Sequence, residues 1–172
     1  MTHILVLGAG IAGMPAAYAL KSRLGPKDEI TVVSDKDHFD FVPSTPWIAM
    51  GWRNRPDISI PIAPHLDARG IHFTGSGVKA IQPENNKVVL NNGETLSYDY
   101  LLIATGIEGH FDEVPGLSSH THSVLDIDQA EDTHAAYKEF VKNPGPLVVG
   151  AMQGSSILGP VYEFAFMADA DL

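Results

Sequence analysis

Short apolar runs separated by a helix-forming stretch dominate the start of the chain. The runs 3–7 and 30–33 are apolar enough to be buried parallel strands. Between them, 11–24 is rich in alanine and leucine and predicts a helix, which Gly25 and Pro26 end. This strand–helix–strand order predicts an α/β fold with a Rossmann-like parallel sheet.

A different pattern follows in the middle of the chain. Residues 78–82, 87–90 and 94–98 are short alternating segments separated by turn residues, which predicts an antiparallel β-meander. The apolar run that begins at Tyr98 and ends in Ala104-Thr105-Gly106 is typical of a buried central strand. We therefore expect a meander inserted into a parallel-sheet protein.

Aromatic residues and prolines crowd the segment 36–61, which has no clean period. We expect a long irregular connection with a functional role. Trp47 and Trp52 within it are expected in the core or an interface. A short helix at 65–69 and a strand at 71–73 follow.

The last third begins with a predicted helix over 126–142, where Asp128 and Glu131 form a plausible capping pair. A strand at 147–150 and a helix at 160–172 then repeat the opening pattern. One such unit cannot bury its apolar face alone. We therefore expect an N-terminal fragment of a longer protein, with an exposed sheet edge that favours self-association.

Three glycines directly after the first strand carry the strongest chemical signal. Gly8 allows a sharp turn, Gly10 lets a pyrophosphate approach the backbone, and Gly13 lets the helix pack close to the strand. The first helical N–H groups and the helix dipole favour an anion there. The predicted dinucleotide site is the loop Gly8, Ala9, Gly10, Ile11, Ala12 and Gly13.

The end of the second strand is where such a fold places an acidic group for the adenosine ribose. Here Ser34 stands first and Asp35 comes one residue later. Asp35 could reach the ribose, Ser34 could make a weaker bond, or Asp35 could simply begin a turn.

The amino-acid composition excludes several classes of partner and of chemical site. The formal net charge of −10 argues against a nucleic acid or an anionic membrane surface as partner. The absence of cysteine excludes disulfides, thiolate metal sites and thiol catalysis within this chain. The eight histidines show no ligand spacing, so no metal site is expected. Without a signal peptide pattern, we expect a cytoplasmic location.

Several longer motifs carry a resemblance to a known family. They are Phe41-Val42-Pro43-Ser44-x-Pro46-Trp47, Gly51-Trp52, Gly70-Ile71-His72-Phe73, Tyr98-Asp99-Tyr100-Leu101, Ala104-Thr105-Gly106 and Gly159-Pro160-x-Tyr162-Glu163-Phe164. The chain resembles the sulfide:quinone oxidoreductase and flavocytochrome c sulfide dehydrogenase flavoproteins, which have two dinucleotide-binding domains. We accordingly expect an FAD-binding domain at 1–112, a connecting loop and helix at 113–146, and the first strand–helix unit of a second, truncated domain at 147–172.

The resemblance implies FAD as the cofactor and a role for each matching position. Glu163 would lie on the sulfide side of the flavin, where it could transfer a proton or only favour the first turn of its helix. The other implied contacts are the glycine loop at the pyrophosphate, Ser34 and Asp35 at the ribose, Val78 at the adenine through its backbone, Ala104, Thr105 and Gly106 over the cofactor, and Pro43 and Ser44 beside the flavin ring.

The departures from the family concern sulfur chemistry. Leu125 and Ile157 occupy the positions of two family cysteines, and Gln129 that of a nearby histidine. Neither apolar side chain can form a persulfide.

We therefore predict an FAD-dependent oxidoreductase of the sulfide:quinone type, passing electrons from a small reductant such as sulfide to a quinone or another acceptor. The alternatives are an NAD(P)H-dependent flavoprotein like type II NADH dehydrogenase, or a flavin-free fragment that is inactive as it stands. The resemblance also allows the full-length protein a peripheral position on the membrane.

Overall fold

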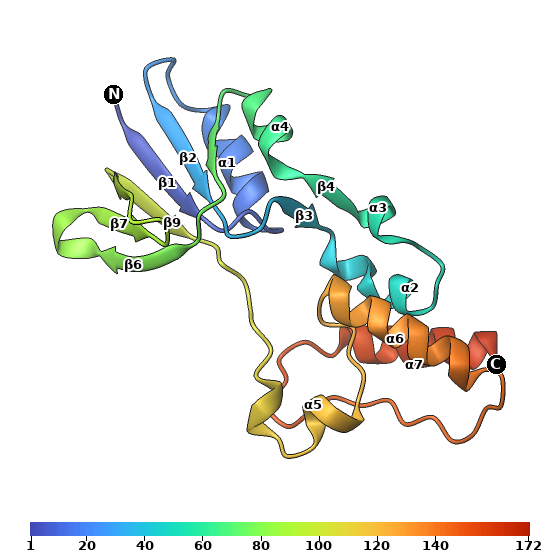
Figure 1. The fold of residues 1–172 in the computed structure, drawn as a ribbon. Coiled ribbons are helices and arrows are strands. Elements are labelled where there is room, and N and C mark those ends of the chain that lie inside the picture. Colours follow the sequence, from blue (N-terminus) through green and yellow to red (C-terminus); the bar gives the residue numbers. More distant parts are fainter. The chain divides into compact units, whose positions relative to one another are not determined.

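The computed structural model describes residues 1–172, and the chain forms two compact units (Figure 1). Residues 1–39 and 59–108 make the first unit, and residues 40–58 and 109–172 make the second. The segment 40–58 thus clusters with the C-terminal residues. The expected division at 112 and 146 concerns domains of a longer protein and stays a prediction.

A parallel sheet organises the first unit, with the strand order β5-β2-β1-β9 (Figure 1). β1 (His3–Leu7) pairs with β2 (Glu29–Val33) and β9 (Tyr100–Ile103), and β2 pairs with β5 (His72–Thr74). Leu7 lies opposite both Val33 and Ile103. The residues that follow these strands therefore emerge at one edge, and the predicted parallel sheet is confirmed.

Alternation along β1 and β2 divides the core of this unit between the two faces of the sheet. Val6 and Val32 pack with residues of α1 (Gly13–Lys21) and α4 (Ile62–Asp67), whereas Leu5 and Val33 pack against the meander. Both helices differ from the predicted bounds of 11–24 and 65–69. A strand that is buried on both faces must be apolar at every position, which explains the continuous apolar runs of β1 and β2.

The predicted meander is also confirmed. β6 (Val78–Gln82), β7 (Lys87–Leu90) and β8 (Thr95–Ser97) pair antiparallel in sequence order. Left-handed residues turn the chain between them, Asn86 at φ 50° and Gly93 at φ 88°.

β9 differs from its predicted place in the sheet. It is an edge strand that pairs with β1 alone, so the expectation of a buried central strand is wrong for this chain. Tyr100 and Ile103 are 66% and 59% exposed as a result. The apolar composition of β9 is typical of a central strand. Within residues 1–172, however, no strand pairs with the edge of β9 that faces away from β1.

The segment 36–61 is more regular than predicted. Its elements are β3 (His38–Asp40), a 3-10 turn (Val42–Ser44), α2 (Thr45–Ala49), α3 (Arg55–Ile58) and β4 (Ser59–Pro61), and β3 pairs with β4. The prolines that suggested irregularity stand at the starts of the short helical pieces. Proline is favourable there because its φ is already helical and no N–H is needed.

The second unit contains a further 3-10 turn, Phe111–Glu113, and the helices α5 (Leu117–His120), α6 (Ile127–Phe140) and α7 (Gly159–Asp171). The predicted cap of α6 is wrong, because Asp126 rather than Asp128 accepts the hydrogen bond from Gln129 N, at 2.9 Å. The Asp128 carboxylate instead binds Arg55.

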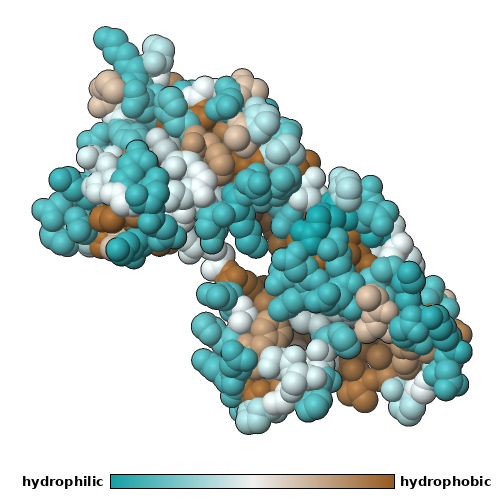
Figure 2. Space-filling model, in the orientation of Figure 1, coloured by the Kyte–Doolittle hydropathy of each residue, from teal (hydrophilic) through white to brown (hydrophobic).

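The predicted strand at 147–150 is not formed, whereas the helix after it is. A strand needs a ladder partner for its backbone groups, and no strand of the chain pairs there. None of the helices combines the length and the apolar content needed to cross a bilayer. Hydrophilic residues cover much of the visible surface of both units, and hydrophobic residues reach it in patches (Figure 2).

Candidate functional site

Two of the three motif glycines are required by the packing of the protein itself. Gly8 has φ +98°, and a Cβ there would lie 2.2 Å from the carbonyl oxygen of Ala104. A Cβ on Gly13 would lie 1.9 Å from the carbonyl oxygen of Gly8. The Gly8 N–H donates to the Val33 oxygen at 2.7 Å, which fixes the turn against β2.

Gly10 differs, because no protein atom lies within 4 Å of the Cβ it would carry. The fold of this unit therefore does not explain a glycine there. A ligand that approaches the backbone would explain it, since a side chain would fill the approach. Ala12, the N-cap residue of α1, makes no side-chain cap bond. In the first turn of α1, Met14 N donates to the Gly10 oxygen at 3.1 Å and Pro15 has no N–H, so the Gly13 N–H is the group left for an anion, and the loop fits a pyrophosphate.

The turn after β2 separates the roles of Ser34 and Asp35. Ser34 Oγ accepts a hydrogen bond from Lys36 N at 3.1 Å, so Ser34, and not Asp35, caps the turn. Asp35 is exposed and close to Gly77, where an added Cβ would lie 3.1 Å from Asp35 Cβ. This favours Asp35 over Ser34 as the ribose ligand.

Gly77 was not among the site residues predicted from the sequence. An added Cβ there would also lie 2.8 Å from Asn91 Nδ2, and the Gly77 oxygen accepts from Asn91 N at 2.8 Å. Gly77 thus brings Val78, the predicted adenine contact, beside Asp35. Only the fold places the two residues together.

The Ala104–Gly106 loop joins the same edge of the sheet. Ala104 N donates to the Leu7 oxygen at 2.8 Å. Gly106 has φ +79° and open space where a Cβ would point. The first unit therefore brings together most of the predicted cofactor contacts, namely Gly8, Ala9, Gly10, Ile11, Ala12, Gly13, Ser34, Asp35, Val78, Ala104, Thr105 and Gly106.

The remaining predicted residues, Pro43, Ser44 and Glu163, belong to the second unit. Glu163 Oε1 accepts a hydrogen bond from Trp47 Nε1 at 2.7 Å. α7 has no acidic residue in its first turn, so the interpretation of Glu163 as a first-turn residue is wrong. The Trp47 contact was not foreseen, because the two residues lie far apart in the sequence.

Trp47 and Trp52 have different environments. Trp47 packs against a buried cluster of the second unit, as predicted, whereas Trp52 is 51% exposed, so a core position is wrong for it. The Arg53 guanidinium lies 4.6 Å from the centroid of the Trp47 ring. The Trp47 indole is thus held on its face by a cation and at its nitrogen by a carboxylate.

The positions at which the resemblance implies cysteines hold no nucleophile. Leu125 is partly buried, and Ile157 is 52% exposed. Gln129, four residues after Leu125, has a buried side-chain oxygen without a hydrogen-bond partner. An unpaired buried acceptor is unfavourable, so it marks a place where a donor is missing.

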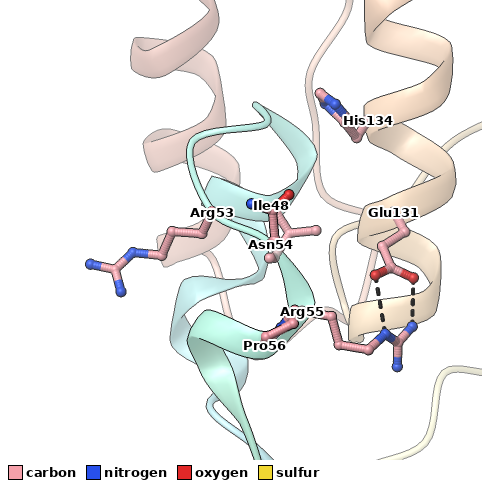
Figure 3. Close-up of a pocket in the computed structure, with 7 residues that line it drawn as sticks. All are labelled: Ile48, Arg53, Asn54, Arg55, Pro56, Glu131 and His134. Atoms are coloured by element: carbon pink, nitrogen blue, oxygen red, sulfur yellow. Dashed lines mark hydrogen bonds and ion pairs between the residues drawn. The ribbon is translucent and has the colours of Figure 1, made fainter.

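A cavity of about 280 Å³ lies between the α2–α3 loop and α6 (Figure 3). It is lined by Ile48, Arg53, Asn54, Arg55, Pro56, Glu131 and His134. Arg55 donates to both oxygens of Glu131, at 3.1 and 2.6 Å, and to Asp128. The hydrogen bonds that Arg55 donates to Glu131, and then those to Asp128, hold the pKa of Arg55 above its usual range.

Glu131 and Asp128 already pair with one of the two arginines that line this cavity. Arg55 is paired, and the Arg53 side chain points away from the other lining residues (Figure 3). His134 Nδ1 lies 3.2 Å from the Ala49 oxygen. The guanidinium of Arg53 lies over the Trp47 ring instead of in an ion pair.

Comparison with known proteins supports the resemblance found in the motifs. The family described as pyridine nucleotide-disulphide oxidoreductase matches residues 2–152. The sulfide-quinone reductase of Aquifex aeolicus is 40% identical over 170 residues, which are 99% of this chain and 39% of that protein. The NADH-rubredoxin oxidoreductase of Clostridium acetobutylicum is 30% identical over 160 residues, 92% of this chain and 39% of that protein.

A solved structure agrees with these matches. The X-ray structure of the Aquifex aeolicus sulfide:quinone oxidoreductase superposes with a TM-score of 0.96 at 39% identity, over 100% of this chain and 40% of that chain. The predicted resemblance and fold class are thus confirmed. The chain spans about two-fifths of the length of these relatives.

Proposed function

Because the chain belongs to the pyridine nucleotide-disulphide oxidoreductase family, we propose that it is the FAD-binding portion of an oxidoreductase of the sulfide:quinone reductase type. Proteins of this family are FAD-binding flavoproteins. Bound FAD would supply the redox chemistry, taking electrons from a small reductant and passing them to a quinone or another acceptor.

One observation carries the proposal. Gly10 faces open space, while its neighbours Gly8 and Gly13 are packed against backbone. Gly10 is therefore the one glycine of the three whose missing side chain is explained by a bound ligand and not by the packing of the protein.

The chain's own residues bind and orient the cofactor in this proposal. The backbone N–H groups of residues 11–13, just before and at the start of α1, hold the pyrophosphate, and the Asp35 carboxylate accepts hydrogen bonds from the ribose hydroxyls. Val78 contacts the adenine through its backbone. Thr105 and Gly106 approach the cofactor closely, because small residues at the end of β9 leave room.

The remaining predicted site residues are proposed to act at the flavin ring. Pro43 and Ser44 lie beside the flavin ring in this proposal, and the Glu163 carboxylate holds or transfers a proton on the reductant side. Leu125 and Ile157 cannot carry sulfur, so sulfide, if used, does not pass through thiols at these positions.

The same substitutions favour a second candidate, in which NAD(P)H is the electron donor. A relative at 30% identity is named as an NADH-rubredoxin oxidoreductase, which supports this alternative. A third possibility is that the chain by itself binds no flavin and has no activity.

Titration with FAD tests the proposal directly. We expect the purified 172-residue chain to bind FAD with a flavin spectrum, and Gly10→Val to weaken binding at least about a hundredfold by filling the phosphate approach. The control is Gly145→Val, because a Cβ on Gly145 also meets open space but lies in an exposed loop of the second unit. Equal FAD affinity in all three proteins would contradict the proposal.

Anaerobic reduction of the FAD-loaded protein separates the candidates. Bleaching by sulfide and not by NADH supports the sulfide:quinone type, and bleaching by NADH alone supports the second candidate. A wild-type chain that takes up no FAD supports the third.

We also propose that the chain self-associates through β9, whose free edge carries the exposed side chains of Tyr100 and Ile103. A cytoplasmic location, with a peripheral position of the longer protein on the membrane, remains a proposal that fractionation of cells would test.

A further inference from the structure

The short helix α2 contacts three separate parts of the second unit. It follows directly on the 3-10 turn that carries Pro43 and Ser44, and its residues Thr45, Ile48 and Ala49 are 1%, 2% and 0% exposed. Polar groups of α2 bind the segment before Leu125, the helix α6 and the helix α7. Hydrogen bonds made by the polar groups of such a buried helix are expected to fix one arrangement of the segments around it.

Two buried threonines hold the backbone just before Leu125. The Thr45 hydroxyl lies 2.8 Å from the Val42 oxygen and 2.5 Å from the Val124 oxygen. From α6, the Thr133 hydroxyl lies 2.6 Å from the Ser123 oxygen. Successive carbonyl groups are therefore held from two helices, and Thr45 also links them to the 3-10 turn.

Trp47 extends the same arrangement to α7. Its indole N–H donates to Glu163 at 2.7 Å, and Arg53 lies over the ring. A hydrogen bond to a carboxylate is stronger and more directional than one between neutral groups. The orientation of the Glu163 carboxylate is thus set from α2.

We propose that α2 is a positioning helix, in which Thr45 fixes the backbone at 123–125 and Trp47 fixes the carboxylate of Glu163. The inference rests on the proposed function, because only there do these positions and the 3-10 turn face the flavin. Neither residue touches the reacting atoms, so both are positioning residues. The arrangement keeps the reacting side in place although the thiols are absent.

Hydrogen exchange of the amides of 122–126 tests the Thr45 contact without any cofactor. We expect Thr45→Val to accelerate exchange there about tenfold or more, Thr45→Ser to restore slow exchange, and Thr133→Val to give a similar acceleration. Thr95→Val, at an exposed position in β8, is the matched control. Wild-type exchange rates in folded Thr45→Val and Thr133→Val would overturn this part.

Carbodiimide labelling and flavin reduction test the Trp47 contact. Trp47→Phe is expected to make the Glu163 carboxylate several-fold more reactive and to lower the limiting rate of flavin reduction about tenfold to a hundredfold. Trp47→His, which keeps a ring N–H, is expected to recover part of both. Trp52→Phe is the control, because Trp52 is exposed and makes no bond to Glu163.

The outcomes separate the two proposals. Sulfide is the reductant used, with NADH in a parallel series, and FAD affinity is measured for every variant. A wild-type chain that binds no FAD overturns the proposed function together with the positioning role. FAD binding and reduction with identical rates in Trp47→Phe and Trp52→Phe overturns the positioning role alone, whereas an FAD-loaded wild type that neither reductant reduces overturns the proposed function as well.

Discussion

Gln129 stands where related flavoproteins are expected to have a histidine, and its environment is unusual for a buried amide. Its backbone N–H donates to the Asp126 carboxylate. Its side-chain oxygen is buried without a partner. A glutamine amide is neutral, so it cannot supply the charge change of the histidine that the resemblance implies here.

Replacement of Gln129 by methionine is predicted to stabilise the protein by about 1 kcal/mol, because it removes an unpaired acceptor at similar volume. Urea denaturation followed by circular dichroism measures the change. Gln153→Met, at an exposed position, is the control and should be neutral. Destabilisation by Gln129→Met instead would indicate that a buried water already satisfies this oxygen.

At the scale of elements, α6 and α7 are joined by a hydrogen bond that depends on pH. The Tyr137 hydroxyl donates to Asp171 at 2.8 Å. Burial, assisted by this bond and by the charge of Asp171, raises the pKa of Tyr137 to about 12. A raised pKa in the folded state means that folding favours the protonated phenol.

The stability contributed by Tyr137 is therefore predicted to be complete below the unfolded value of about 10 and to be lost as the pH rises through about 12. Absorbance titration of tyrosinate and thermal unfolding across this range measure both effects. Tyr137→Phe should remove this part of the pH dependence, and Asp171→Asn should lower the pKa of Tyr137. A Tyr137 that ionises together with the exposed tyrosines would contradict the prediction.

Some helices and strands could be predicted from the sequence and others could not, because only some of them impose a pattern on their residues. β1, β2 and the meander strands carry their own signal, because burial imposes either a continuous apolar run or strict alternation. α2 and α3 were missed because each is too short to show a helical period. Their prolines, which suggested a loop, are in fact compatible with a helix start.

At the scale of the whole molecule, the sheet of the first unit ends in a strand whose second side is unpaired. β9 pairs only with β1, and its exposed residues are apolar. Free backbone groups beside apolar side chains favour pairing with another copy of the chain.

We predict that the molecular mass measured by light scattering rises with protein concentration, and that Ile103→Lys keeps the chain monomeric at about 100 μM, a concentration in the range where exposed edges associate. A lysine on an edge strand opposes pairing because its charge would be buried. Ile157→Lys is the control, because Ile157 is similarly exposed but lies in the second unit. A monomeric wild type, or equal dissociation by both variants, would contradict pairing through β9.

The sequence by itself determined the class of fold and the pyrophosphate loop. Each depends on local requirements: buried strands must be apolar, and the turn at Gly8 and the packing at Gly13 exclude side chains within a few residues of each other. Family membership followed from such local motifs as well.

Only the tertiary structure decided which distant residues meet. It separated the roles of Ser34 and Asp35, placed Asp35 beside Gly77, and paired Trp47 with Glu163. No periodicity records such contacts, because a hydrogen bond between residues over a hundred positions apart imposes no pattern on either segment. They exist only once the packing of the core has brought the two segments together.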